Sequence, residues 1–177
     1  KGSLLAEQLV FGCEYAGGGC GPKTKSFMVM ATNGAWSKPH GWWNMISAAK
    51  QRGVNIIVID ARRTKVAELA TIHLQPKQGT DAALGAGICR VLFEEGLFNK
   101  PFCDKWVYGV EEYRNYCKDF TPEKTEAITG VPADLIVKAA RMYAEGPGSF
   151  ALTSQSLSHS RNGVNSARAL LNIPAIL

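Results

Sequence analysis

Three short polar segments carry the side chains best suited to hold a nucleotide. In the first, the amide of Asn33 and the hydroxyl of Ser37 can form hydrogen bonds with phosphate oxygens. In the second, Asp60 can accept hydrogen bonds from ribose hydroxyls, and Arg62 can pair with a phosphate in a forked geometry. In the third, the carboxylate of Asp81 can accept two hydrogen bonds from guanine, whose edge offers adjacent N–H donors. Together these side chains predict a nucleotide site.

Each polar segment follows a short apolar run that is typical of a buried strand. These runs cover residues 27–31, 55–60 and 72–74, and helices are predicted between them at 39–52 and 65–70. Apolar strands that alternate with helices are typical of a parallel sheet covered on both faces. Because ligands of such sheets bind beyond the carboxyl ends of the strands, we expect the three polar segments to lie along one edge.

The rest of the chain is predicted to be mainly helical. Helices are expected at 81–95, after the N-cap residue Thr121, and at 131–144. A further strand is predicted at 150–153 and a helix at 162–172. The predicted fold class is α/β, a Rossmann-like doubly wound and mostly parallel sheet with helices on both faces and a helical insertion.

We expect residues 1–177 to form a single cofactor-binding domain that is part of a larger multidomain chain. The sequence begins at Lys1 rather than a methionine and ends within an apolar run, at Leu177. Four parts are expected: a loop and helix lead-in at 1–26, a strand–helix–strand nucleotide-binding core at 27–81, a helical part at 82–145, and a strand and helix at 146–177.

Composition narrows the class of protein. The net charge of +5 suits a partner that carries phosphate. Five cysteines without a CxxC pair argue against a disulfide scaffold and against a zinc site. No apolar run is long enough to predict a transmembrane segment.

A nucleic-acid-binding module is disfavoured because basic and aromatic residues do not alternate on one face. A nicotinamide-dependent dehydrogenase domain is the other alternative, disfavoured because no G-x-G-x-x-G joins a strand to a helix.

The stretch 56–81 (IIVIDARRTKVAELATIHLQPKQGTD) closely resembles the cofactor-binding stretch of the molybdopterin oxidoreductase (dimethyl sulfoxide reductase) family. That family shows a strand, Asp-Pro-Arg-Arg-Thr, a small helix and a Pro-Gly-Thr-Asp-like loop. Residues 32–39 (TNGAWSKP) resemble its Gly-x-Asn-Pro-x-x-Ser-x-Pro loop, and residues 128–141 are also similar to it. Two departures from the pattern are Ala31, where a glycine is usual, and Ala61, where a proline is usual.

The resemblance assigns three groups of residues to three parts of a bound pyranopterin guanine dinucleotide. Those expected to line its phosphates are Thr32, Asn33 and Ala35. Those expected to contact ribose and phosphate are Asp60, Arg62 and Thr64. Those expected to contact guanine are Gly79, Thr80 and Asp81.

A second loop, at 154–163, resembles one that lies near the pterin and the metal. Ser154 and Ser156 stand where the family often has glycines, and His159-Ser160 stands in place of Gln-His. His159 is therefore a candidate contact to cofactor or substrate. The metal ligand is expected just upstream of Lys1, with Cys13 as the internal alternative, and no catalytic residue is assigned.

The resemblance implies part of the catalytic subunit of an enzyme that performs two-electron redox chemistry or oxygen-atom transfer on a small-molecule substrate. The implied cofactor is molybdenum or tungsten held as a bis(molybdopterin guanine dinucleotide), with an iron–sulfur cluster in a separate N-terminal domain. The implied partners are other domains of the same chain and an electron-transfer subunit, and no nucleic acid is expected. Formate dehydrogenase-like and acetylene hydratase-like members are both compatible, and the latter would add water without net redox change. A fragment that has lost its ligand competence also stays open.

Overall fold

The computed structural model describes residues 2–13, 19–37, 39–152, 157 and 159–177. Within these residues the strands form one parallel sheet in the order β3-β2-β1-β4. The strands are β1 (Ser26–Met30), β2 (Asn55–Ile59), β3 (Ile72–Leu74) and β4 (Gly148–Leu152). Because all of them run in the same direction, their carboxyl ends lie at one edge of the sheet.

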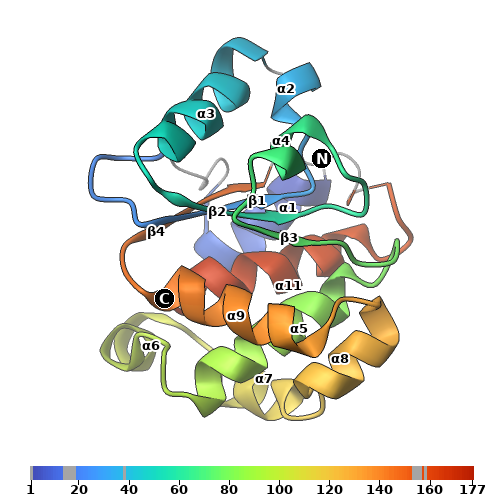
Figure 1. Cartoon of the computed structure of the whole chain (residues 1–177). Helices are drawn as coiled ribbons and strands as arrows, with labels where there is room; N and C mark the ends of the chain where they lie inside the picture. Colours follow the sequence, from blue (N-terminus) through green and yellow to red (C-terminus); the bar gives the residue numbers. More distant parts are fainter. Residues whose placement is uncertain (1, 14–18, 38, 153–156, 158) are drawn as a thin grey trace.

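Helices cover both faces of this sheet (Figure 1). On one face lie α2 (Gly34–Ser37), α3 (Asn44–Gln51) and α4 (Lys65–Glu68), with the π-helix η1 (Pro39–Trp43) between α2 and α3. On the other face lie α1 (Gly2–Phe11), α5 (Asp81–Glu94), α9 (Ala133–Ala144) and α11 (Gly163–Ala175). Beyond this second layer lie α6 (Lys100–Trp106), α7 (Val110–Cys117) and α8 (Pro122–Thr129).

Alternate side chains of β1 and β2 point into two separate apolar cores, as the two-residue period of a strand requires. Phe27 and Val58 belong to the core beneath α3 and α4. Met28 and Ile57 belong to the larger core formed with α5, α9 and α11. All four side chains are fully buried. Full burial of one such side chain contributes about 1.5–3 kcal/mol, so the central strands are stabilised from both faces.

The predicted strands are confirmed, each within two residues of its predicted start and end. The predicted N-cap is also confirmed, because the Thr121 hydroxyl oxygen accepts a hydrogen bond from the amide of Lys124 at 3.3 Å. The helix predicted at 39–52 differs: η1 occupies its first five residues, and the α-helix begins only at Asn44. In this wider turn Trp42 lies directly against Gly34 of α2. The contact is so close that a Cβ on Gly34 would lie 2.8 Å from the Trp42 Cβ.

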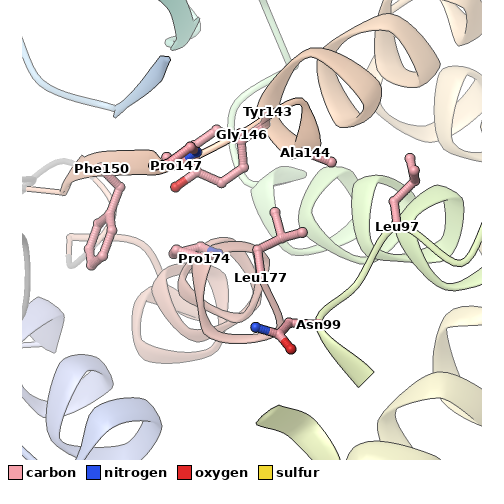
Figure 2. A pocket seen from close by; sticks show the side chains of 10 residues that line it. Leu97, Asn99, Tyr143, Ala144, Gly146, Pro147, Phe150, Pro174 and Leu177 are labelled. Carbon is pink, nitrogen blue, oxygen red and sulfur yellow. The ribbon is translucent and has the colours of Figure 1, made fainter. Parts of the chain in front are cut away.

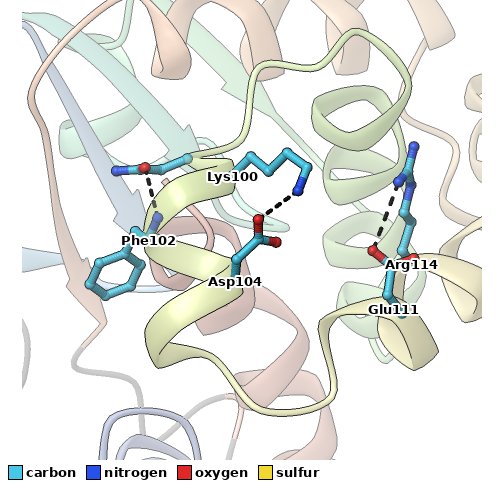
Figure 3. A network of polar contacts seen from close by, with 6 residues as sticks. Lys100, Phe102, Asp104, Glu111 and Arg114 are labelled. Atoms are coloured by element: carbon cyan, nitrogen blue, oxygen red, sulfur yellow. Dashed lines mark hydrogen bonds and ion pairs between the residues drawn. The ribbon is translucent and has the colours of Figure 1, made fainter.

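Local polar contacts organise the outer helices (Figure 3). The Asn99 side chain caps α6 by accepting a hydrogen bond from the amide of Phe102 at 3.2 Å. Lys100 and Asp104 pair at 2.5 Å one turn apart, and Glu111 and Arg114 pair at 3.9 Å in α7. Exposed pairs of this kind add little to stability, so burial of Cys103 of α6 and Cys117 of α7 in the larger core does more to fix where these helices lie.

Helix α5 is the central helix of the larger core, and two glycines allow its neighbours to approach closely. A Cβ on Gly85 would lie 2.6 Å from the carbonyl oxygen of Ala169 in α11. A Cβ on Gly87 would lie 2.5 Å from the Thr125 hydroxyl oxygen in α8. Helices α11 and α8 can therefore occupy their positions only because these two side chains are absent.

None of the helices in the described ranges is both long enough and apolar enough to cross a lipid bilayer.

We expect Gly85→Ala to destabilise the protein. The new methyl group would overlap backbone atoms of α11, and overpacking of this kind costs about 1–3 kcal/mol. Replacing a helical glycine by alanine returns only about 1 kcal/mol through helix propensity. Denaturant unfolding followed by circular dichroism should show a lower midpoint for Gly85→Ala. Gly21→Ala is the matched control, since only the Thr24 hydroxyl oxygen lies near its Cβ, at 4.0 Å. An unchanged midpoint for Gly85→Ala would mean that α11 moves freely away from α5.

Candidate functional site

A pocket of about 530 Å³ lies at the carboxyl edge of the sheet. It receives residues that follow every strand: Ala31 after β1; Asp60, Ala61 and Arg62 after β2; Gln78 and Asp81 after β3; and Leu157, His159 and Ser160 after β4. Residues that are far apart in the sequence thus meet in one place because the strands are parallel.

Two carboxylates lie in this pocket and differ in their surroundings. Asp60 is only 9% exposed, and its Oδ1 accepts a hydrogen bond from the backbone amide of Arg62 at 2.8 Å. This contact closes a tight turn after β2 and leaves Oδ2 for another donor. Asp81 is the first residue of α5. Burial raises its pKa, its own backbone amide partly offsets that effect, and the charge of Asp60 raises the pKa further.

Arg62 supplies a positive charge to the same pocket. Its side chain is exposed, and none of the ion pairs found in the described part of the chain involves it. Its guanidinium can therefore reach an anion without breaking an ion pair. A cation in the same pocket as two carboxylates suits a ligand that carries both phosphate and hydrogen-bond donors.

Ala31 enters the pocket through an unusual backbone conformation. Its φ of +49° lies in the left-handed region, which favours glycine because a Cβ is crowded there. This explains in physical terms why a glycine is the expected residue at this position. Keeping an alanine here costs the chain roughly 1–2 kcal/mol.

The other predicted residues after β1 lie outside the pocket lining. Thr32 is buried, and Ala35 lies in α2 against the core beneath α3. The carbonyl of Asn33 accepts hydrogen bonds from the amides of Trp36 and Ser37, both at 3.0 Å, and so begins α2. Its side-chain Oδ1 is buried and has no hydrogen-bond partner among the described residues. A buried amide oxygen without a hydrogen-bond donor is costly unless a ligand or water supplies one.

The remaining predicted residues shape the loops around the pocket. Thr64 is buried and caps α4, its hydroxyl oxygen accepting from the amide of Ala67 at 3.3 Å. Gly79 has a φ of +82°, so a side chain would be strained there. The Thr80 hydroxyl donates to the carbonyl of Lys77 at 2.7 Å and closes the turn before α5.

Five pocket residues were not assigned roles from the sequence: Ala31, Ala61, Gln78, Leu157 and Ser160. Gln78 lies between the third predicted strand and Asp81, so the sequence could have indicated that it lies near the site. Leu157 and Ser160 follow β4, and the candidate His159 enters the pocket with them. Ser154 and Ser156 lie outside the described residues.

The proposed internal metal ligand, Cys13, is an exposed thiol just after α1. Within the described ranges, no three His, Cys, Asp or Glu side chains gather closely enough to hold a metal ion. The structure therefore provides no metal centre around Cys13 in that part of the chain.

A second pocket, of about 480 Å³, lies near the amino end of β4 (Figure 2). Phe150, Pro174 and Leu177 line it together with Tyr143, and none of its lining residues is charged. Burial raises the Tyr143 pKa far above its ordinary value, so its phenol stays neutral. Because it offers no charged side chain, this pocket suits a phosphate-bearing ligand less well than the pocket at the carboxyl edge, which contains Arg62.

Comparison with known proteins connects this architecture to a family. No protein-family model matches the chain. Acetylene hydratase of Syntrophotalea acetylenica is 39% identical to it over 142 residues, which make up 78% of this chain and 19% of that protein. Formate dehydrogenase H of Escherichia coli is 37% identical over 130 residues, which make up 73% of this chain and 18% of that protein.

A solved structure gives the same result. Acetylene hydratase from Pelobacter acetylenicus matches the fold with a TM-score of 0.86 at 32% identity, over 98% of this chain and 24% of that chain. The chain spans about a fifth of the length of the curated relatives it matches. Those relatives are molybdopterin oxidoreductases, and family members use molybdenum or tungsten pterin cofactors and iron–sulfur clusters. The chain is therefore homologous to one segment of the molybdopterin oxidoreductases.

Proposed function

We propose that this chain supplies part of the cradle for the pyranopterin guanine dinucleotide of a molybdenum or tungsten enzyme. The observation that carries the proposal is the meeting of Asp60, Arg62 and Asp81 in one pocket at the carboxyl edge of a parallel sheet. The chain's homology to these enzymes supports the same cofactor.

We infer that the fold is one half of a Rossmann-like doubly wound arrangement. The strand order supports this inference, because the chain proceeds from β1 to β2 to β3 on one side and then places β4 on the other side of β1. In such sheets ligands bind where the strand order reverses. We propose that residues 1–177 act as one cofactor-binding domain of a larger chain, with 27–81 as its nucleotide-binding core.

The groups in the pocket fit a guanine nucleotide. Arg62 can pair with phosphate, and the Oδ2 of Asp60 can accept from a ribose hydroxyl. Asp81 can accept from adjacent N–H groups of guanine. The Oδ1 of Asn33, which is buried and has no partner in the described part of the chain, can accept a further hydrogen bond from the ligand. We propose that Thr32, Ala35, Thr64, Gly79 and Thr80 complete the cradle. When bound, the cofactor supplies the metal centre for two-electron or oxygen-atom transfer.

Similarity to two enzymes with different reactions also favours a cofactor role. The chain is 39% identical to a hydratase and 37% identical to a formate dehydrogenase. A segment retained in both serves what the two have in common, rather than either reaction. For the whole protein we propose redox chemistry on a small-molecule substrate. The TM-score of 0.86 with acetylene hydratase makes hydration without net redox change the second candidate.

We further propose that the full-length protein carries an iron–sulfur cluster in another domain and passes electrons to a second subunit. Relatives named as alpha subunits of formate dehydrogenases support the second point.

The first test is made on the full-length protein produced in a host that makes the cofactor. We expect molybdenum or tungsten by mass spectrometry, with about two guanine nucleotides per metal released by acid, the bis-dinucleotide stoichiometry.

Asp81→Asn should lower the guanine content. Loss of a hydrogen bond to a charged group costs about 1.5–3 kcal/mol of binding free energy, which weakens binding by about 10–100-fold.

Asp119→Asn is the matched control, since Asp119 is exposed between α7 and α8 and does not line the pocket at the carboxyl edge. Equal guanine contents in the two variants would remove Asp81 from the site. Absence of both metal and guanine from the unmodified protein would overturn the proposed function.

Although Asp81→Asn should weaken cofactor binding, the raised pKa of Asp81 predicts that the same substitution stabilises the cofactor-free protein. The fold favours the protonated acid, so its contribution to stability is full below the ordinary value of 3.8 and is lost as pH rises through the higher folded-state pKa. Asp81→Asn should therefore raise the unfolding midpoint relative to the unmodified protein at about pH 7, and by less at about pH 4. Thermal unfolding at both pH values checks this, with Asp119→Asn as control. A variant that is less stable at neutral pH would contradict it.

A further inference from the structure

The turn after β2 carries two groups of the candidate site, Asp60 and Arg62. The backbone hydrogen bonds of the sheet do not satisfy every carbonyl of this turn. Two contacts set the pattern: the amide of Ala31 donates to the carbonyl of Ile59 at 2.7 Å, and the amide of Asp60 donates to the carbonyl of Leu74 at 3.2 Å. By the same pattern, the carbonyl of Asp60 should accept from the amide of residue 76. That residue is Pro76, which has no N–H to donate.

A side chain supplies the missing donor. The Nε2 of His73 lies 2.9 Å from the carbonyl oxygen of Asp60. A carbonyl oxygen can only accept, so Nε2 must carry the hydrogen, as it does in one neutral tautomer and in the imidazolium ion. The imidazole on β3 thus completes the hydrogen bonding where the proline interrupts it.

The next carbonyl of the turn is held in the same way. The Nε2 of Gln75 donates to the carbonyl oxygen of Ala61 at 2.9 Å. Arg62 follows directly, with its amide bonded to Oδ1 of Asp60. Two side chains from β3 and the residue after it therefore hold two successive carbonyls of the turn that presents Asp60 and Arg62.

We propose that His73 and Gln75 are positioning residues, which replace the backbone donor lost at Pro76 and hold Asp60 and Arg62 in place for the ligand. That the ligand is a guanine dinucleotide rests on the proposed function. The hydrogen bonds by which His73 and Gln75 fix the turn do not depend on it. Gln75 is exposed and His73 is partly exposed, so their loss should loosen the turn rather than unfold the protein.

The test uses the full-length protein with three substitutions. His73→Leu and Gln75→Leu remove the donors, and His73→Gln keeps an N–H at about the distance of Nε2. Hydrogen exchange of the amides at 61–64 should be roughly two- to tenfold faster in both leucine variants, the effect of losing one hydrogen bond, and unchanged in β1. The guanine nucleotide released by acid should fall severalfold in the same two variants. His73→Gln should restore both readings, which a role in packing alone would not produce.

His40→Leu is the matched control, since His40 is exposed in η1 on a different element from this turn. The inference is overturned if both leucine variants keep the exchange rates and guanine content of the unmodified protein, or if His73→Gln fails to restore them. Gln75→Leu keeps the test decisive should His73→Leu not fold. If exchange rises as expected while the unmodified protein contains neither the metal nor guanine, the proposed function fails and the role of His73 and Gln75 in holding the turn stands.

Discussion

Side chains of β1 and β2 are removed from water on both faces, and the remaining elements are arranged around that requirement. A strand buried on both faces needs a layer of helices above and below it, and each connection between parallel strands must cross one of those layers. The consequence for function is direct. Every strand then ends at the same edge, so residues separated by more than a hundred positions, such as Ala31 and His159, line one pocket.

Close packing in the helical layer on one face constrains the position of Asp81 at this edge. Helix α5 begins at Asp81, inside the candidate site, and continues into the deepest part of the core, where Gly85 and Gly87 accept α11 and α8 at close range. Residue Asp81 is therefore held by a helix that cannot shift without disturbing its neighbours. A binding group on such an element keeps its position when the ligand is absent, which lowers the cost of ordering on binding.

The candidate site concentrates features that cost stability. Asp81 is an acid whose pKa is raised by burial and by a neighbouring carboxylate, and Ala31 holds a left-handed backbone conformation. The Asn33 side chain has a buried oxygen without a partner in the described part of the chain. Each of these would be relieved by a different residue or by a bound ligand. Costs of this kind gather where binding, rather than folding, selects the residue.

The sequence alone determined the strands, the order of the polar segments and the family resemblance, because these depend on local patterns. The alternation of apolar runs with helices, and the run from Ile56 to Asp81, are readable without coordinates. The sequence also placed Asp60, Arg62 and Asp81 at strand ends, which is why they were found. Tertiary structure alone decided that these three line the pocket while the hydroxyl of Thr64 caps α4 and that of Thr80 closes a turn, because a hydroxyl that can bind a ligand can equally bond to nearby backbone. It also decided that Leu157 and Ser160 join them, and that His73 serves the carbonyl which Pro76 leaves without a donor. Those contacts depend on strand order and register, which no single segment of the sequence encodes.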